Sequence, residues 1–180
     1  PEVIRTSAGD LVGVTTNYFN AANVTTDGID LELAYSFPEN TLGEFSLTLD
    51  ASHYLSYKIP AGGSKIDISK EIDIVGLFNH DNFARSLPDT KANASLRWVN
   101  GANNASLTAR HVAGYKTTRA NPPAGYSQNI DSHLTWDAQY NYQLSADSID
   151  TQITLGILNL TDEEPPLLWD SVNFSYDSRQ

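Results

Sequence analysis

The side chains best suited to chemistry are scattered, and their spacing matches no known catalytic or metal site. The sequence has no Gly-x-Ser-x-Gly elbow, no phosphate-binding glycine loop and no dinucleotide fingerprint. The histidines form neither an i, i+4 pair nor a HExxH spacing; they are His53, His80, His111 and His133. Cysteine is absent, which excludes disulfides and cysteine metal ligands. These patterns predict no enzyme, no cofactor and no metal site.

Two groups of carboxylates have a chemical and a structural interpretation. Asp30 and Glu32 share one face of an extended segment, as an acid–base pair would. The acidic run 162–164 resembles the carboxylate clusters that bind calcium. We favour the structural interpretation of both: the first pair lies on the wet face of a strand, and the second group is a solvated turn before two prolines.

Positive side chains are few. The net charge is −11, with 11 Lys and Arg against 22 Asp and Glu, and such a chain is a poor ligand for nucleic acid. Arg97 and Arg110 fall on polar strand faces. We expect them to pair with carboxylates such as Asp50 or Asp137, with contact to an anionic ligand as the alternative.

The elements that would position these residues are strands. Every even residue from Leu134 to Leu144 is apolar or aromatic and every odd one between them is polar, which is the period of a strand with one apolar face. Residues 151–160 repeat the pattern after a short turn at 145–150. Trp136, Tyr140 and Tyr142 all lie on the apolar face, where outer-membrane barrels carry aromatic girdles.

The same alternation continues through most of the chain. Further strands are predicted at 29–37, 44–58, 91–99 and 105–115, and a small hairpin is predicted within 1–23. Short connections (38–43, 100–104, 145–150) alternate with long ones (59–88, 116–131, 161 onward). Strands of 10–15 residues are too long for an ordinary sandwich but long enough to cross a bilayer at a tilt.

This rhythm predicts an all-β fold: an antiparallel up-and-down meander of about six long strands, which forms a segment of a large transmembrane β-barrel. Outer-membrane lipid would cover the apolar face, and water would fill the lumen beside the polar face. Six strands are fewer than the eight of the smallest barrels, so we expect an open, curved sheet.

Three blocks of sequence resemble the C-terminal part of TonB-dependent outer-membrane receptors. They are TTDGIDLELAY at 25–35, LPDTKANASLRW at 87–98 and TLGILNLTDEEPP at 154–166, and their order and spacing match as well. The resemblance implies a receptor of the Gram-negative outer membrane with a 22-stranded barrel and an N-terminal plug. Such a receptor imports a scarce ligand with energy from the inner-membrane TonB complex.

The resemblance also implies that residues 1–180 are a partial C-terminal barrel domain. The plug, with the TonB-contacting segment, would precede Pro1, and the closing strand would follow Gln180. The ligand class stays open among siderophores, vitamins, oligosaccharides and polyphenol-like compounds. A secreted all-β carbohydrate-binding or adhesin module is the alternative from another class, and an apolar face packed against a second layer would favour it.

Ligand recognition is expected in the long connections, because loops on a rigid scaffold usually carry it. Four aromatic residues near or within them could stack on a sugar or a siderophore ring: Tyr115, Tyr126, Trp169 and Tyr176. Interface anchoring or loop packing is the structural alternative for the same residues.

Overall fold

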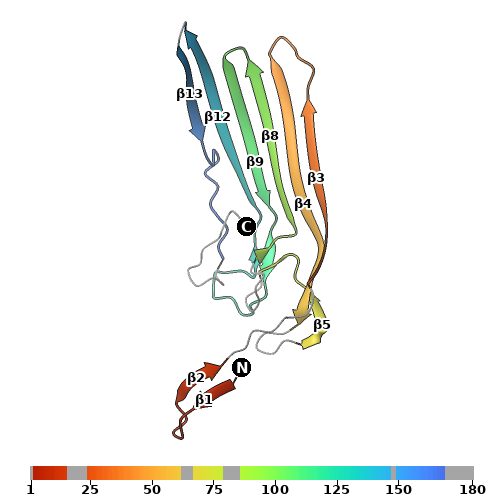
Figure 1. The fold of residues 1–180 in the computed structure, drawn as a ribbon, viewed down its shortest axis with the longest axis vertical. Coiled ribbons are helices and arrows are strands. Elements are labelled where there is room, and N and C mark those ends of the chain that lie inside the picture. Colours follow the sequence, from red (N-terminus) through yellow and green to blue (C-terminus); the bar gives the residue numbers. More distant parts are fainter. Residues whose placement is uncertain (1, 16–23, 62–66, 79–85, 147–148, 169–180) are drawn as a thin grey trace.

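Six long strands form one antiparallel, up-and-down sheet in the computed structural model (Figure 1). The structure describes residues 2–15, 24–61, 67–78, 86–146 and 149–168. The long strands are β3 (Thr25–Ser36), β4 (Glu44–Ala61), β8 (Thr90–Asn100), β9 (Asn103–Val112), β12 (His133–Ala146) and β13 (Ile149–Ile157). Their order is β13-β12-β9-β8-β4-β3, and the short β5 (Asp67–Asp73) pairs with the end of β4. No helix in the described ranges is long and apolar enough to cross a membrane.

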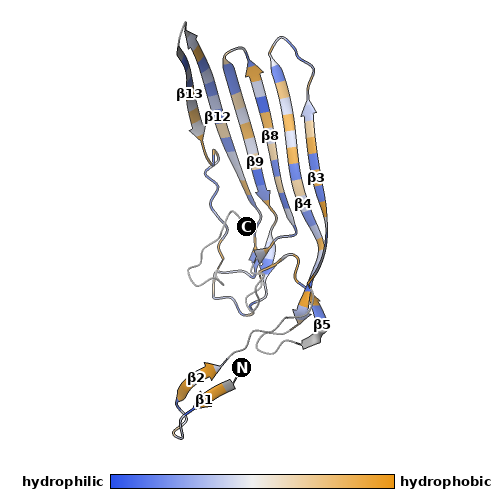
Figure 2. Cartoon of the chain, viewed as in Figure 1, coloured by the Kyte–Doolittle hydropathy of each residue, from blue (hydrophilic) through white to orange (hydrophobic). Residues whose placement is uncertain are grey.

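The pairing registers align like with like across the sheet. One apolar row runs through Leu33, Leu49, Ala94, Ala109 and Trp136, each opposite the next on the neighbouring strand. Orange and blue bands alternate along β3, β4 and β8 (Figure 2). The apolar side chains stay exposed, with Leu31 at 51% and Leu155 at 66%, so no second layer of the described chain covers them. A β-sandwich requires a packed interior between two sheets, so the exposed apolar face argues against the alternative of a sandwich module.

The second and third short connections are tighter than the alternation predicted, whereas the first spans 37–43. Ala146 pairs with Ile149, so β12 and β13 continue through most of the predicted 145–150 turn. The first connection closes through paired hydrogen bonds between Asn40 and Gly43. The predicted strand 105–115 is displaced: β9 begins at Asn103 and ends at Val112, and Tyr115 belongs to a separate strand.

A β-bulge interrupts the large sheet where β3 and β4 approach the long connections. Asp27 pairs with Ser56 whereas Gly28 pairs with Tyr54, so Leu55 of β4 lies opposite no residue of β3. Beyond the bulge Tyr57 faces Thr26, which lies on the same side as Gly28. Tyr57 therefore leaves the apolar face predicted from simple alternation and joins Tyr54 on the polar face, where the two rings are in contact.

The long connections pack against one another into what we call the loop unit. It is a four-stranded sheet with the order β11-β10-β6-β7, where β6 is Leu77–Phe78, β7 Ser86–Leu87, β10 Tyr115–Thr117 and β11 Asn129–Ile130. Four buried side chains form its core: Phe78, Tyr115, Ile130 and Leu168. The main apolar cluster of the described chain thus lies in its connections and not under its sheet.

The predicted N-terminal hairpin is present as β1 (Glu2–Arg5) and β2 (Leu11–Thr15). The large sheet does not close: within the described residues β3 pairs only with β4, and β13 pairs only with β12. The two strands lie at opposite sides of the curved sheet (Figure 1). The predicted all-β, open antiparallel sheet is confirmed.

Candidate ligand-facing surface

The candidate functional surface is the polar face of the large sheet. Its register brings together residues distant in sequence, in rows that run across the strands. One row contains Glu32, Asp50, Asn93 and Arg110. The next contains Thr48, Ser95, Thr108 and Asp137. Because every second residue contributes, six strands supply a continuous surface of charged, hydroxyl and amide groups.

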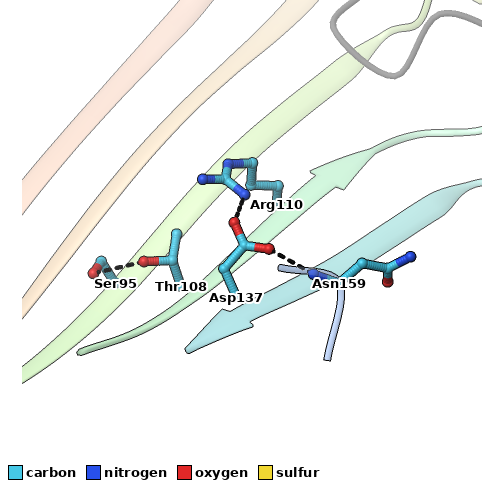
Figure 3. A network of polar contacts seen from close by, with 5 residues as sticks. All are labelled: Ser95, Thr108, Arg110, Asp137 and Asn159. Atoms are coloured by element: carbon cyan, nitrogen blue, oxygen red, sulfur yellow. Dashed lines mark hydrogen bonds and ion pairs between the residues drawn. The ribbon is translucent and has the colours of Figure 1, made fainter. Parts of the chain in front are cut away.

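Asp137 is the centre of a network that joins the wall to the chain after β13 (Figure 3). Arg110 donates to Asp137 Oδ2 in an ion pair, which confirms the expected pairing of these two residues. The backbone N–H of Asn159 donates to the other carboxylate oxygen at 2.9 Å. In the same row as Asp137, the hydroxyls of Ser95 and Thr108 are 3.0 Å apart. Asp137 therefore has a structural role at the start of a long connection.

An uncharged amide cluster lies nearer the short turns. The Asn141 side-chain oxygen accepts hydrogen bonds from Gln139 at 3.1 Å, Gln152 at 3.1 Å and Thr154 at 2.8 Å. The cluster borders a shallow recess of about 200 Å³. This cluster of neutral amides therefore lies toward the turn end of the polar face, whereas Asp30, Glu32 and Arg110 lie toward the loop end.

Asp30, His53 and Glu163 each make a hydrogen bond within the chain. Asp30 accepts a hydrogen bond from Ser52 at 2.6 Å. Glu163 and Asn159 exchange two hydrogen bonds of 3.0 Å in the turn at 159–163. His53 bonds Thr90 at 2.7 Å on the apolar face. His80 lies outside the described residues; within them, no three His, Cys, Asp or Glu side chains are placed to hold a metal ion.

The four predicted ligand-contact residues have different surroundings. Tyr115 is only 6% exposed in the core of the loop unit, where burial raises the pKa of its hydroxyl and a hydrogen bond with Ser86 lowers it less. Tyr126, 39% exposed, lines a recess of about 260 Å³ with Asp131 and Leu167. The structure does not bring the two rings to one surface. Trp169 and Tyr176 lie outside the described residues.

Alternation alone missed one aromatic pair on the polar face. Tyr54 and Tyr57 lie three residues apart, a spacing that would place them on opposite faces of a regular strand. The bulge brings their rings into edge-to-face contact with centroids 6.3 Å apart. Gly28, a glycine within a strand pattern, was the available signal, because such a glycine often marks a bulge.

The fold and this surface define the class of protein. A long-stranded sheet with an uncovered apolar face, a polar opposite face, short turns at one end and long connections at the other is a section of the wall of a transmembrane β-barrel. Open edges are not tolerated in hydrocarbon, so β3 and β13 need further strands beside them in the membrane.

The comparison with known families then identifies the family of barrels to which this sheet belongs. The sequence model described as TonB dependent receptor-like, beta-barrel, matches residues 3–160, and the chain belongs to this family. The resemblance seen in the three sequence blocks is confirmed. No curated protein and no solved structure matches the chain. TonB-dependent receptors are transport receptors of the outer membrane and not enzymes.

Proposed function

We propose that this chain is part of an outer-membrane receptor that imports a scarce ligand, a siderophore, a vitamin or an oligosaccharide, in a TonB-dependent way. The observation that carries the proposal is the two-faced wall. Leu31, Leu155 and their rows offer lipid an apolar surface, while the opposite face offers hydrogen-bonding groups to a water-filled lumen. The partners are outer-membrane lipid, the inner-membrane TonB complex and the ligand. The proposed location is the outer membrane of a Gram-negative bacterium.

Residues 1–180 would then be a partial C-terminal barrel domain, since both edge strands of the described sheet require neighbours. Recognition would begin in the loop unit and the connections around it. Tyr126, with its half-exposed ring beside Asp131, is the contact residue that this geometry favours. Tyr115 would act by holding β10 against β6 and β11. Trp169 and Tyr176 remain proposed contacts.

The test uses the complete receptor in its own host. The receptor should fractionate with outer membranes and migrate differently on a gel before and after boiling. Growth on the imported nutrient should be lost both on deletion of the receptor gene and on deletion of tonB. A receptor found in the soluble fraction, or nutrient uptake unaffected by loss of TonB, would refute the proposal.

A further inference from the structure

We propose that the polar face carries a carbohydrate-binding subsite, built around Tyr54 and Asp30 at the loop end of β3 and β4. This inference rests on the proposed import function and deepens it by assigning a chemical class to the ligand. It is carried by a recess, an aromatic pair and a carboxylate that lie together, and none of these was among the predicted ligand contacts.

The recess itself is the first observation. It has a volume of about 220 Å³ and is lined by Thr26, Gly28, Asp30, Ser52, His53 and Tyr54. Whole small-molecule pockets usually measure roughly 300–1,000 Å³, so this recess suits one ring of a longer ligand. A Cβ at Gly28 would lie 3.0 Å from the backbone oxygen of His53, so the close approach of β3 and β4 at this edge of the recess favours glycine.

The aromatic surface is the second observation. Tyr54 lines the recess, and the Tyr57 ring meets it at an interplanar angle of 77°. Only the bulge allows two tyrosines three residues apart to share this face. A sugar ring has an apolar face of C–H groups, and an aromatic side chain covers such a face with little loss of conformational entropy.

The carboxylate is the third observation. Asp30 Oδ1 accepts the hydroxyl of Ser52 at 2.6 Å, which fixes the carboxylate and leaves Oδ2 for another donor. Hydroxyl donors to a carboxylate form short, charge-assisted hydrogen bonds. An aromatic face beside an oriented carboxylate therefore matches both surfaces of a sugar, its C–H face and its ring of hydroxyls.

The position suits a ligand that arrives from outside. Tyr54 N donates to Asp89 O at 2.8 Å, and Tyr57 N donates to Asp73 Oδ1 at 3.1 Å. Both acceptors belong to the long connection between β4 and β8. Hydrogen bonds from this connection therefore hold the backbone of Tyr54 and Tyr57 in place. Such bracing orders the subsite before the ligand binds, which lowers the entropic cost of association.

Charge argues against an anionic ligand at this position. The recess contains one carboxylate and neither Lys nor Arg. Glu32 and Asp50, directly opposite each other, lie one row away on the same face. Lys91, opposite Ser52, is the nearest positive residue by register. A multiply charged ferric catecholate would be repelled here, whereas a neutral sugar would not.

The test measures calorimetric binding of four neutral hexasaccharides to the complete receptor in detergent: maltohexaose, cellohexaose, xylohexaose and chitohexaose. We expect at least one to bind, and Tyr54→Ala and Asp30→Asn each to weaken that binding about tenfold or more. Tyr142→Ala, a tyrosine on the apolar face, should change it less than twofold. The heat-induced gel shift confirms that each variant is folded.

Two results would overturn the subsite: no hexasaccharide binds, or binding is the same in Tyr54→Ala and Asp30→Asn as in the parent. The import function is tested separately with a ferric tris-catecholate and cyanocobalamin as probes. TonB-dependent uptake of either probe, unchanged in Tyr54→Ala, would reject the carbohydrate subsite and leave import standing. A receptor absent from the outer membrane would reject import itself.

Discussion

At the scale of the residue, Asp137 connects the large sheet to the segment that follows β13. Its carboxylate pairs with Arg110 on the wall and accepts the N–H of Asn159 beyond the end of β13. Asn159 adopts a φ of 51° and bonds Glu163, so the same carboxylate holds the turn that starts a long connection. Wall and connection are thus joined through one side chain.

We expect Asp137→Ala to free residues 158–163 from the wall at a cost of about 1.5–3 kcal/mol, the usual value of hydrogen bonds to a charged group. Limited proteolysis of the intact receptor should cut this segment faster than in the parent. Asp150→Ala, an exposed aspartate near the opposite end of the polar face, is the control and should leave the cleavage rate unchanged. Equal cleavage rates for Asp137→Ala and the parent would show that Asp137 does not hold residues 158–163 against the wall.

Tyr115 provides a pH-dependent prediction, and it lies in the loop unit outside the membrane-crossing part of the wall. Burial raises its pKa above the ordinary 10.0. The unfolded loop unit would therefore lose the proton at lower pH, so this contribution to stability is complete below pH 10 and declines as pH rises through the folded pKa. The near-ultraviolet dichroism of the receptor should report this loss.

Tyr115→Phe has no proton to lose, so its loop unit should keep its packing to higher pH than the parent. Tyr126→Phe, which removes the hydroxyl of a more exposed ring, serves as the matched control and should follow the parent. If Tyr115→Phe and the parent lose their dichroism at the same pH, ionisation of Tyr115 is not the cause.

At the scale of the element, two short turns contain glycines with positive φ, and only one of these glycines also lies close to a neighbouring strand. Gly43 has a φ of 110°, and a Cβ there would lie 2.3 Å from the backbone oxygen of Val99. Gly101 has a φ of 57° and open space around it. The first turn is therefore closed against the neighbouring hairpin, whereas the second only needs a left-handed residue.

We expect Gly43→Ala to cost roughly 3 kcal/mol or more, because backbone strain and a clash with β8 add together. Gly101→Ala should cost only about 1–2 kcal/mol, the penalty of the left-handed conformation. Urea unfolding of the receptor in lipid vesicles measures the difference. Similar costs for the two substitutions would show that the contact with Val99 does not constrain the turn.

At the scale of the whole molecule, neighbouring residues on one strand face different solvents. Leu49 belongs to the central apolar row, and Thr48 belongs to the polar face. Leu49→Arg should destabilise the assembled receptor by about 2–4 kcal/mol, since it places a charge in lipid near the bilayer midplane. Thr48→Arg should have a much smaller effect. Equal unfolding midpoints in vesicles would mean that lipid does not cover the apolar face.

The sequence by itself determined the wall. Alternation of apolar and polar residues arises from strand geometry and from the contrast between lipid and water, and both act on each residue locally. The alternation in the sequence therefore revealed the six long strands, their order and their two faces. The Arg110–Asp137 pairing was also accessible, because adjacent polar strands bring opposite charges together. Family membership followed from sequence blocks that the comparison confirmed.

Only the tertiary structure decided where the aromatic side chains point. One unpaired residue beside Gly28 moved Tyr57 to the polar face, and alternation cannot show such a shift because it assumes an unbroken register. Tyr115 joined Phe78, Ile130 and Leu168, from connections up to about 90 residues apart in sequence. Contacts between loops depend on where distant segments meet, and no local pattern in the sequence encodes that meeting.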